Sequence, residues 1–219
     1  MKGSLKVDLS IYHKKDWTVV SEGIQDFSIR SDFYISNKIS NFNIEVMSMI
    51  GGVQRVESFI GKMRSYKPAA NTGFNWELIS SDRLYLKGSY KNSIRRLVYD
   101  NGGLIKRLFI VDGIEKYTIF FVGERNLENF YQSLSNVALI KHVSEEVLSM
   151  KETNELLFPN LTADEINILS YSLRNGFFDS PRKLDMSGLK DNFNKSKSTL
   201  NYHLRKGIKK ILNSYLMDQ

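Results

Sequence analysis

The sequence predicts an α+β protein in which a β-rich N-terminal domain precedes an all-α C-terminal domain. Up to about residue 143 the chain is rich in β-forming and aromatic residues, with turn signals between the runs. After about residue 160, apolar residues recur at three- and four-residue spacing, as in amphipathic helices. Between them, residues 144–159 are polar and end at Pro159. We therefore expect domains at residues 1–143 and 160–219, joined by a linker at 144–159.

The N-terminal domain begins with three expected strands and a helix. Leu5–Ile11 alternates between apolar and polar residues, which is typical of a half-buried strand. Phe27–Ile35 and Ile39–Met47 are two further strand candidates, separated by a polar turn. Apolar residues then recur at helical spacing from Val53 to about Tyr66, so a helix is expected before the next proline.

The second part of this domain has the element order β-α-β-β-α-β. The expected strands are Leu84–Lys87, Leu104–Val111, Lys116–Val122 and Val137–Val143, with helices around residues 94–98 and 127–134. Asp112-Gly113 favours a two-residue hairpin turn between two of them. This order is that of a ferredoxin-like unit. The strand Lys116–Val122 is apolar on both faces, so we expect its second face to be covered by the N-terminal strands or by a second subunit.

Three helices with clear start signals follow in the C-terminal domain. Thr162 and Glu165 form a capping box, Asp185 can cap a second helix, and Ser196 can cap a third. The positions expected to face the core are Ile166, Leu169 and Leu173, then Met186, Leu189 and Phe193, then Leu200, Leu204, Ile208, Ile211 and Tyr215. Two short helices, a tight turn and a long basic helix are typical of a helix-turn-helix.

Three motifs in this segment are more specific than the helix pattern. They are Leu161-Thr-x-x-Glu165, Asn175-Gly-Phe-Phe-Asp-Ser-Pro-Arg182 and Ser196-Lys-Ser-Thr-Leu-x-x-His-Leu-Arg205. With these motifs, residues 161 to about 212 resemble the helix-turn-helix domain of the archaeal bacterio-opsin activator family. The resemblance implies an archaeal transcription regulator that binds double-stranded DNA. The chain departs from that family at Lys190, where the family has a small residue, and at Asn194-Lys195, where it has Gly-Ile.

Polar side chains on the open side of the third helix are the expected DNA contacts. The expected DNA-binding residues are Arg182, Ser196, Lys197, Ser198, Asn201, Tyr202, Arg205 and Lys209. Asn201 can bond adenine bidentately, Arg205 can bond guanine, and Tyr202 suits a thymine methyl group or a phosphate. The remaining five suit phosphates, which position a protein without reading sequence.

Charge and composition agree with a polyanion partner and argue against several other classes. The net charge is +7, and residues 161–219 carry ten basic and six acidic residues against 21 and 18 in the first 160. The absence of cysteine excludes disulfides and thiol catalysis, and three scattered histidines argue against a zinc site. We expect no cofactor, no metal, no membrane span and a cytoplasmic location. The motif His13-x-x-Asp16-Trp17-Thr18 resembles a His-x-x-Cys-Trp-Thr motif of archaeal relatives, and no site is inferred from it.

Two alternative functions and one assembly question stay open. Tyr117, Phe120 and Phe121 could form the sheet surface of a single-stranded RNA-binding protein, although they lie on both faces, as core residues do. An enzyme is less favoured, because no nucleophile with a base and no pair of carboxylates stands out, and no catalytic residue is proposed. A homodimer is expected, because one helix-turn-helix reads few base pairs. We favour the N-terminal domain, as a sensory or oligomerisation domain, for the interface. Its effector, the operator and the direction of regulation are left open.

Overall fold

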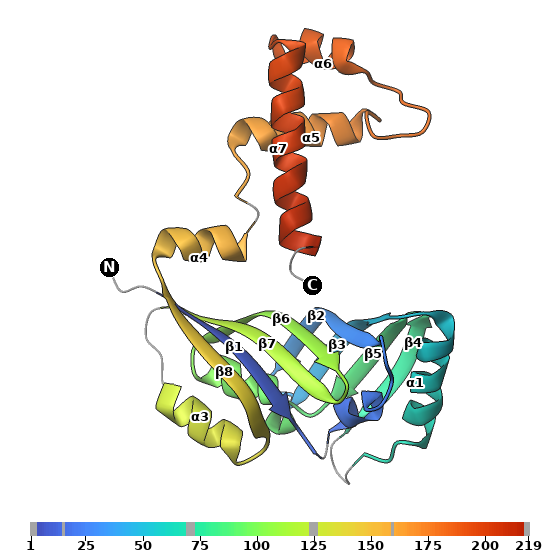
Figure 1. Ribbon diagram of the computed structural model, residues 1–219, viewed down its shortest axis with the longest axis vertical. Coiled ribbons are helices and arrows are strands. Elements are labelled where there is room, and N and C mark those ends of the chain that lie inside the picture. The colour runs from blue at the N-terminus through green and yellow to red at the C-terminus, as the bar shows by residue number, and fades with distance from the viewer. Residues whose placement is uncertain (1–3, 15, 69–72, 123–126, 159, 217–219) are drawn as a thin grey trace. The chain divides into compact units, whose positions relative to one another are not determined.

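The computed structural model describes residues 4–14, 16–68, 73–122, 127–158 and 160–216, which form two compact units (Figure 1). Unit 1 spans Met1–Ser149 and unit 2 spans Met150–Gln219. The strands of unit 1 are β1 (Ser4–Tyr12), β2 (Ser28–Asn37), β3 (Phe42–Ile50), β4 (Asn75–Ser80), β5 (Arg83–Gly88), β6 (Gly103–Val111), β7 (Ile114–Val122) and β8 (Leu139–Leu148). Its helices are η1 (Trp17–Ser21), α1 (Val53–Ser65), η2 (Tyr90–Asn92), α2 (Ile94–Asp100) and α3 (Leu127–Ser135).

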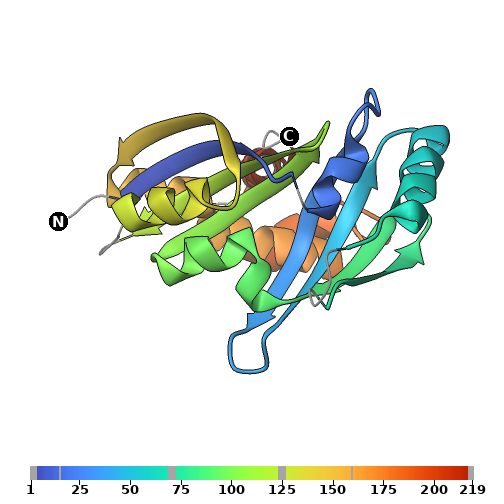
Figure 2. The same cartoon turned by 90° about the horizontal axis from the view of Figure 1, so that it is seen from below.

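The strands of unit 1 form one antiparallel sheet whose described order is β4-β5-β3-β2-β6-β7-β1-β8. Helices α1, α2 and α3 cover one face of this sheet (Figure 2). The core lies under them, because alternate residues of β1 and β7 point to that face: Leu5, Val7, Leu9 and Ile11 stand opposite Phe121, Ile119, Tyr117 and Glu115. At the centre of the sheet, β2 and β6 are paired only at Ile29–Ile110 and Arg30–Phe109 among the described residues.

The sheet consists of two similar halves that exchange their first strands. The first half runs β1, η1, β2, β3, α1, β4, and the second runs β5, α2, β6, β7, α3, β8. Each half therefore has the element order β-α-β-β-α-β. In the sheet, however, β5 lies between β3 and β4, and β1 lies between β7 and β8. Each half therefore contains the first strand of the other half in the place of its own first strand.

The ferredoxin-like unit predicted within one half is therefore wrong in its strand pairing. Its elements are present, but its expected first strand, Leu84–Lys87, pairs with β3 and β4. The strand lengths are compatible with this pairing, since all nine residues of β1 pair with the nine of β7, while β5 and its neighbour β4 have six each. A local apolar pattern specifies a strand but not its partner. Strand β4 was also missed, and β8 extends to Leu148, so residues 144–148 belong to the sheet rather than to a linker.

Two further expectations for unit 1 concern the Asp112-Gly113 turn and the second face of the strand that follows it. The Asp112-Gly113 hairpin turn is confirmed: both residues have positive φ, 51° and 74°, as a two-residue turn between twisted strands requires. The second face of the strand Lys116–Val122 was expected to be covered by the N-terminal strands or by a second subunit, and Phe120 on this strand is only 1% exposed without any second subunit. That strand therefore gives no argument for an intersubunit surface.

Unit 2 is helical and contains the expected caps. Its helices are α4 (Met150–Leu157), α5 (Ala163–Arg174), α6 (Met186–Phe193) and α7 (Lys197–Leu216). The capping box of Thr162 and Glu165 is formed, Asp185 accepts from two amides at the start of α6, and Ser196 accepts from the Thr199 amide. No helix within the described part of the chain is long and apolar enough to cross a membrane.

The buried faces of two helices differ from the expected ones. On α5 the buried residues are Glu165, Ile168 and Ser172, whereas Ile166 and Leu173 are largely exposed. The buried face of α5 is thus the one that carries Ile168 in the core and Glu165, which is paired with Lys210 of α7. On α7, Leu200 and Leu204 are buried as expected, but Ile211 and Tyr215 are 40% and 60% exposed, since the helix extends past the small core.

Candidate nucleic-acid interface and a cavity in unit 1

The three helices α5, α6 and α7 pack around a small core that fixes the face of α7 that remains open. That core consists of Ile168, Phe177, Leu189, Leu200 and Leu204. Leu200 and Leu204 are one helical turn apart and buried, so the stripe of α7 that contains them faces the core. Side chains on the opposite side of the helix therefore point outward. The outward stripe contains Ser198, Asn201, Tyr202, Arg205 and Lys209, all of them exposed. One helix therefore presents amide, hydroxyl and guanidinium groups together.

The other predicted contact residues lie around the start of α7 and in the loop before α6. Ser196 and Lys197 are exposed, and Lys197 Nζ donates to Ser187 Oγ at 2.8 Å, which links α7 to α6. Arg182 is exposed with its guanidinium 4.9 Å from the centre of the Phe177 ring. Tyr202 lies on the open stripe and its hydroxyl accepts from Lys206 Nζ at 3.0 Å. All eight predicted residues are thus accessible.

Two basic residues of the segment 195–210 form ion pairs with acidic residues of α5. Lys195 Nζ lies 3.0 Å from Asp164, and Lys210 Nζ lies 2.7 Å from Glu165, both on α5. Burial raises the pKa of Glu165, but hydrogen bonds from Lys210 and from the Thr162 amide outweigh it, so the pKa is lowered overall. Glu165 is therefore ionised and connects the cap of α5 to α7. This charge pairing was missed from the sequence, where the segment reads as a uniformly basic surface.

The arrangement of α5, α6 and α7 can be compared with known protein families. Residues 161–213 match the family described as the HTH DNA binding domain, and no curated protein matches the chain. These three helices are therefore similar to a helix-turn-helix DNA-binding domain. The match supports the bacterio-opsin activator type that the motifs predicted and spans well under half of the chain.

The two departures from the family pattern are accommodated within the helix-turn-helix domain. Lys190 is exposed, so its long side chain does not enter the core. Asn194 ends α6 in the left-handed conformation, with φ 47° and ψ 38°, where asparagine is the best substitute for glycine. Lys195 replaces an apolar anchor by its ion pair with Asp164. The turn before α7 is therefore closed by a charge contact.

Unit 1 contains a cavity of about 420 Å³, a size that fits a small ligand. It is lined by aromatic side chains, among them Trp17, Tyr34, Tyr66 and Phe74, and by charged side chains, among them Asp16, Glu45, Arg95 and Glu115. The two halves of the sheet contribute equivalent strands, since Glu45 lies on β3 and Glu115 on β7. Sequence analysis did not identify this cavity, because its lining residues are scattered from position 13 to position 137.

Glu45 and Arg95 form a buried ion pair in the cavity wall. Their side chains are 7% and 12% exposed. Ser31 Oγ also donates to Glu45 Oε1 at 2.5 Å, and the Arg95 guanidinium lies 4.9 Å from the centre of the Tyr34 ring. Burial disfavours the charge of Arg95, but the charge of Glu45 outweighs this and raises the Arg95 pKa. Burial raises the pKa of Glu45, and the charge of Arg95 offsets only part of this effect. The pair fixes α2 to β3.

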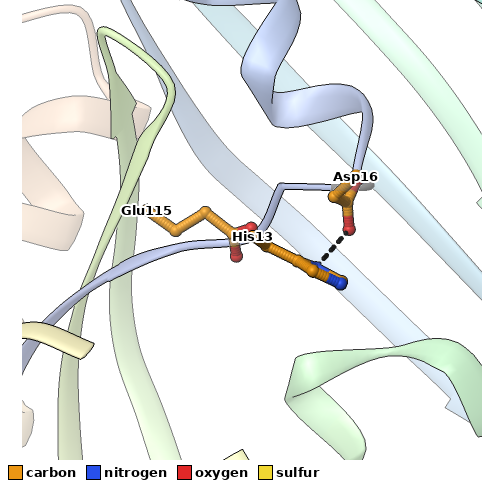
Figure 3. A group of neighbouring side chains, drawn as sticks. All are labelled: His13, Asp16 and Glu115. Carbon is orange, nitrogen blue, oxygen red and sulfur yellow. Dashed lines mark ion pairs between the residues drawn. The ribbon is translucent and has the colours of Figure 1, made fainter. Parts of the chain in front are cut away.

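A second group of charged side chains, His13, Asp16 and Glu115, lies at the same cavity (Figure 3). His13 Nδ1 lies 3.1 Å from Asp16 Oδ2. Glu115 is 2% exposed, and burial raises its pKa to about 7, with a further contribution from the charge of Asp16. Burial lowers the pKa of His13, but Asp16 outweighs it and raises that pKa overall. Of these contacts, only the i,i+3 pair of His13 and Asp16 has a local signal in the sequence.

Proposed function

We propose that this protein is a sequence-specific double-stranded DNA-binding transcription regulator whose helix α7 enters the major groove. The observation that carries the proposal is the open stripe of α7 within a helix-turn-helix domain. Asn201 and Arg205 on that stripe are one turn apart, so both can reach base edges from one helix lying in the groove. Lys197 and Ser196 at the start of α7 suit the phosphates beside them.

The charge arrangement of α7 supports this orientation. Lys195 and Lys210 are held by α5, whereas Arg205 and Lys209 have no ion pair among the described residues. Their charges are therefore available to a polyanion on the open side. Binding is expected to weaken with salt, because each lysine or arginine that contacts a phosphate releases a counterion.

Base reading and phosphate contact on α7 predict different phenotypes. Arg205→Ala and Asn201→Ala should each relax the preference at particular base pairs, at a cost of about 1–3 kcal/mol in binding free energy to the preferred site. Lys209→Ala should weaken binding to all sequences and reduce the salt slope by about one. Selection from a random duplex library, followed by titration of the selected site at several salt concentrations, measures both effects.

A charge-matched control separates these contacts from net charge. Lys38→Ala removes one positive charge from an exposed position of unit 1 and should leave both sequence preference and salt slope unchanged. If Asn201→Ala reduced binding equally to all sequences, Asn201 would not read a base. If Lys38→Ala reproduced the effect of Lys209→Ala, the lysine on α7 would act only through overall charge.

The single-stranded RNA-binding alternative is not supported by the sheet. Its three aromatic residues, Tyr117, Phe120 and Phe121, are at most 2% exposed, whereas base stacking requires open rings. In the proposed division of roles, residues 160–219 contact DNA. The N-terminal domain, expected at residues 1–143, binds an effector or forms the subunit interface. A clear preference for duplex DNA over single-stranded RNA of the same sequence is the expected result.

A homodimer is part of this proposal, since two domains can meet half-sites about 34 Å apart. Apolar side chains are exposed on both units: Phe33 and Leu104 in unit 1, and Leu212 and Tyr215 at the end of α7. We expect light scattering to give a dimer at micromolar concentration, and Phe33→Glu with Leu104→Glu to shift it toward monomer. The double variant Leu212→Glu with Tyr215→Glu makes the same change on α7 and tests that surface as the interface. If only that pair dissociated the dimer, the interface would lie on α7, and a monomeric wild type would contradict dimerisation.

A further inference from the structure

The group His13, Asp16 and Glu115 has the composition and geometry of a metal site. One potential ligand atom from each residue lies within 4.8 Å of the other two (Figure 3). A divalent ion held at about 2.0–2.2 Å from each ligand would separate neighbouring ligands by roughly 3–3.5 Å. Small side-chain rotations therefore suffice. We propose that these three residues bind one divalent transition-metal ion.

The fold, rather than chance proximity of surface groups, brings the three residues together. In the β1–β7 pairing, Ile11 stands opposite Glu115, and His13 follows two residues later, directly after the end of β1. Asp16 follows His13 by three residues at the start of η1, so its carboxylate returns to the imidazole. The register of two nine-residue strands thus sets the position of the third ligand relative to the other two.

The helix η1 is attached to the β6–β7 hairpin, which keeps the site in place. Thr18 Oγ1 donates to Glu115 Oε1 at 3.1 Å, and the Gly113 amide donates to Ser21 Oγ at 2.9 Å. Tyr117 OH donates to Glu115 Oε2 at 2.5 Å. Both carboxylate oxygens of Glu115 are therefore oriented and each keeps a lone pair. Such hydrogen bonds to ligating carboxylates are the usual support of protein metal sites.

The chemistry of the three groups selects the class of ion. Two carboxylates would neutralise a divalent cation, and the neighbouring cation Arg95 is already paired with Glu45. His13 Nδ1 is buried and makes no hydrogen bond of correct geometry, although Asp16 lies close to it. One imidazole nitrogen with two carboxylate oxygens suits zinc, cobalt or manganese, whereas magnesium prefers oxygen ligands and water.

The site also has room for more ligands than the protein supplies. All three residues line the cavity of about 420 Å³, so water or a small molecule can complete the coordination sphere. Three protein ligands with an open position are typical of metal sites that exchange a ligand. The inference concerns unit 1 alone and does not depend on DNA binding by α7.

Metal titration of the full-length protein tests the site. After treatment with a chelator and its removal, Co²⁺ and Zn²⁺ should each bind at one equivalent in calorimetry, and Mg²⁺ at least tenfold more weakly. Bound Co²⁺ should give visible absorption bands that Zn²⁺ displaces. His13→Ala and Asp16→Asn should each weaken Zn²⁺ binding at least tenfold. Thr18→Val, which removes a hydrogen bond to Glu115 but no ligand, should weaken it about tenfold.

His142→Ala is the matched control, because His142 is exposed on β8 and outside the group. It should leave Zn²⁺ affinity unchanged. Absence of Zn²⁺ and Co²⁺ binding to the wild type in calorimetry would overturn the proposal without any variant. It would also be overturned if His142→Ala weakened Zn²⁺ binding as much as His13→Ala did, or if Zn²⁺ and Mg²⁺ bound equally well. Near-ultraviolet circular dichroism shows that each variant is folded.

Discussion

Replacing Arg95 by methionine is expected to lower the free energy of unfolding of unit 1 by about 3–5 kcal/mol, because the change leaves the buried carboxyl group of Glu45 without its partner. The methionine keeps most of the volume of arginine, so a cavity contributes little. The contact of the guanidinium with the Tyr34 ring is lost as well. Both tryptophans of the chain, Trp17 and Trp76, lie in unit 1, so urea unfolding followed by tryptophan fluorescence reports this unit.

A double-mutant cycle separates loss of the ion pair from loss of packing. Glu45→Gln with Arg95→Met removes both charges and keeps a side chain that can accept from Ser31 Oγ. This double variant should recover at least half of the stability lost in Arg95→Met, since no unpaired charge remains buried. If the double variant were as unstable as the single one, the arginine would act through packing and the ion pair would be incidental.

Gly207→Val should unfold the helix-turn-helix domain and abolish DNA binding. Gly207 is buried where α7 crosses α5, and an added Cβ would lie 2.6 Å from Leu169 Cδ1 and 3.4 Å from Glu165 Cβ. The Leu169 side chain can rotate away from one Cβ, but the two further methyl groups of valine force the helices apart. Overpacking of this kind costs about 1–3 kcal/mol. Among the described residues, the core of this domain contains five buried apolar side chains, so a loss near the upper limit leaves little of it folded.

Two other variants define what the Gly207 result means. Gly61→Val in α1 is the matched control, because no atom lies within 4 Å of a Cβ at that position, and it should be neutral or slightly stabilising. Gly207→Ala should fall between wild type and Gly207→Val. Far-ultraviolet circular dichroism during heating and a DNA mobility-shift assay measure the outcome. Full DNA binding by Gly207→Val would show that α5 and α7 do not need this close approach.

Local signals were sufficient wherever a residue acts on its immediate neighbours in the chain. The capping box of Thr162 and Glu165, the cap at Asp185 and the Asp112-Gly113 turn each involve residues at most three positions apart, and all are present as expected. The helix-turn-helix motifs belong to the same category, because their helices follow one another with short turns. For this reason the resemblance of the C-terminal segment to a known family was recognisable from the sequence, and the match to residues 161–213 supports it.

The sequence by itself therefore determined the helix-turn-helix domain, its caps and the open stripe of α7 with Asn201 and Arg205. The tertiary structure alone decided which strand pairs with which, because β1 and β5 have similar patterns and differ mainly in length. It also decided the cavity, where Glu115 stands beside His13 only through the β1–β7 register. Contacts between residues about a hundred positions apart leave no periodic pattern in either segment, since each depends on a pairing that neither segment specifies.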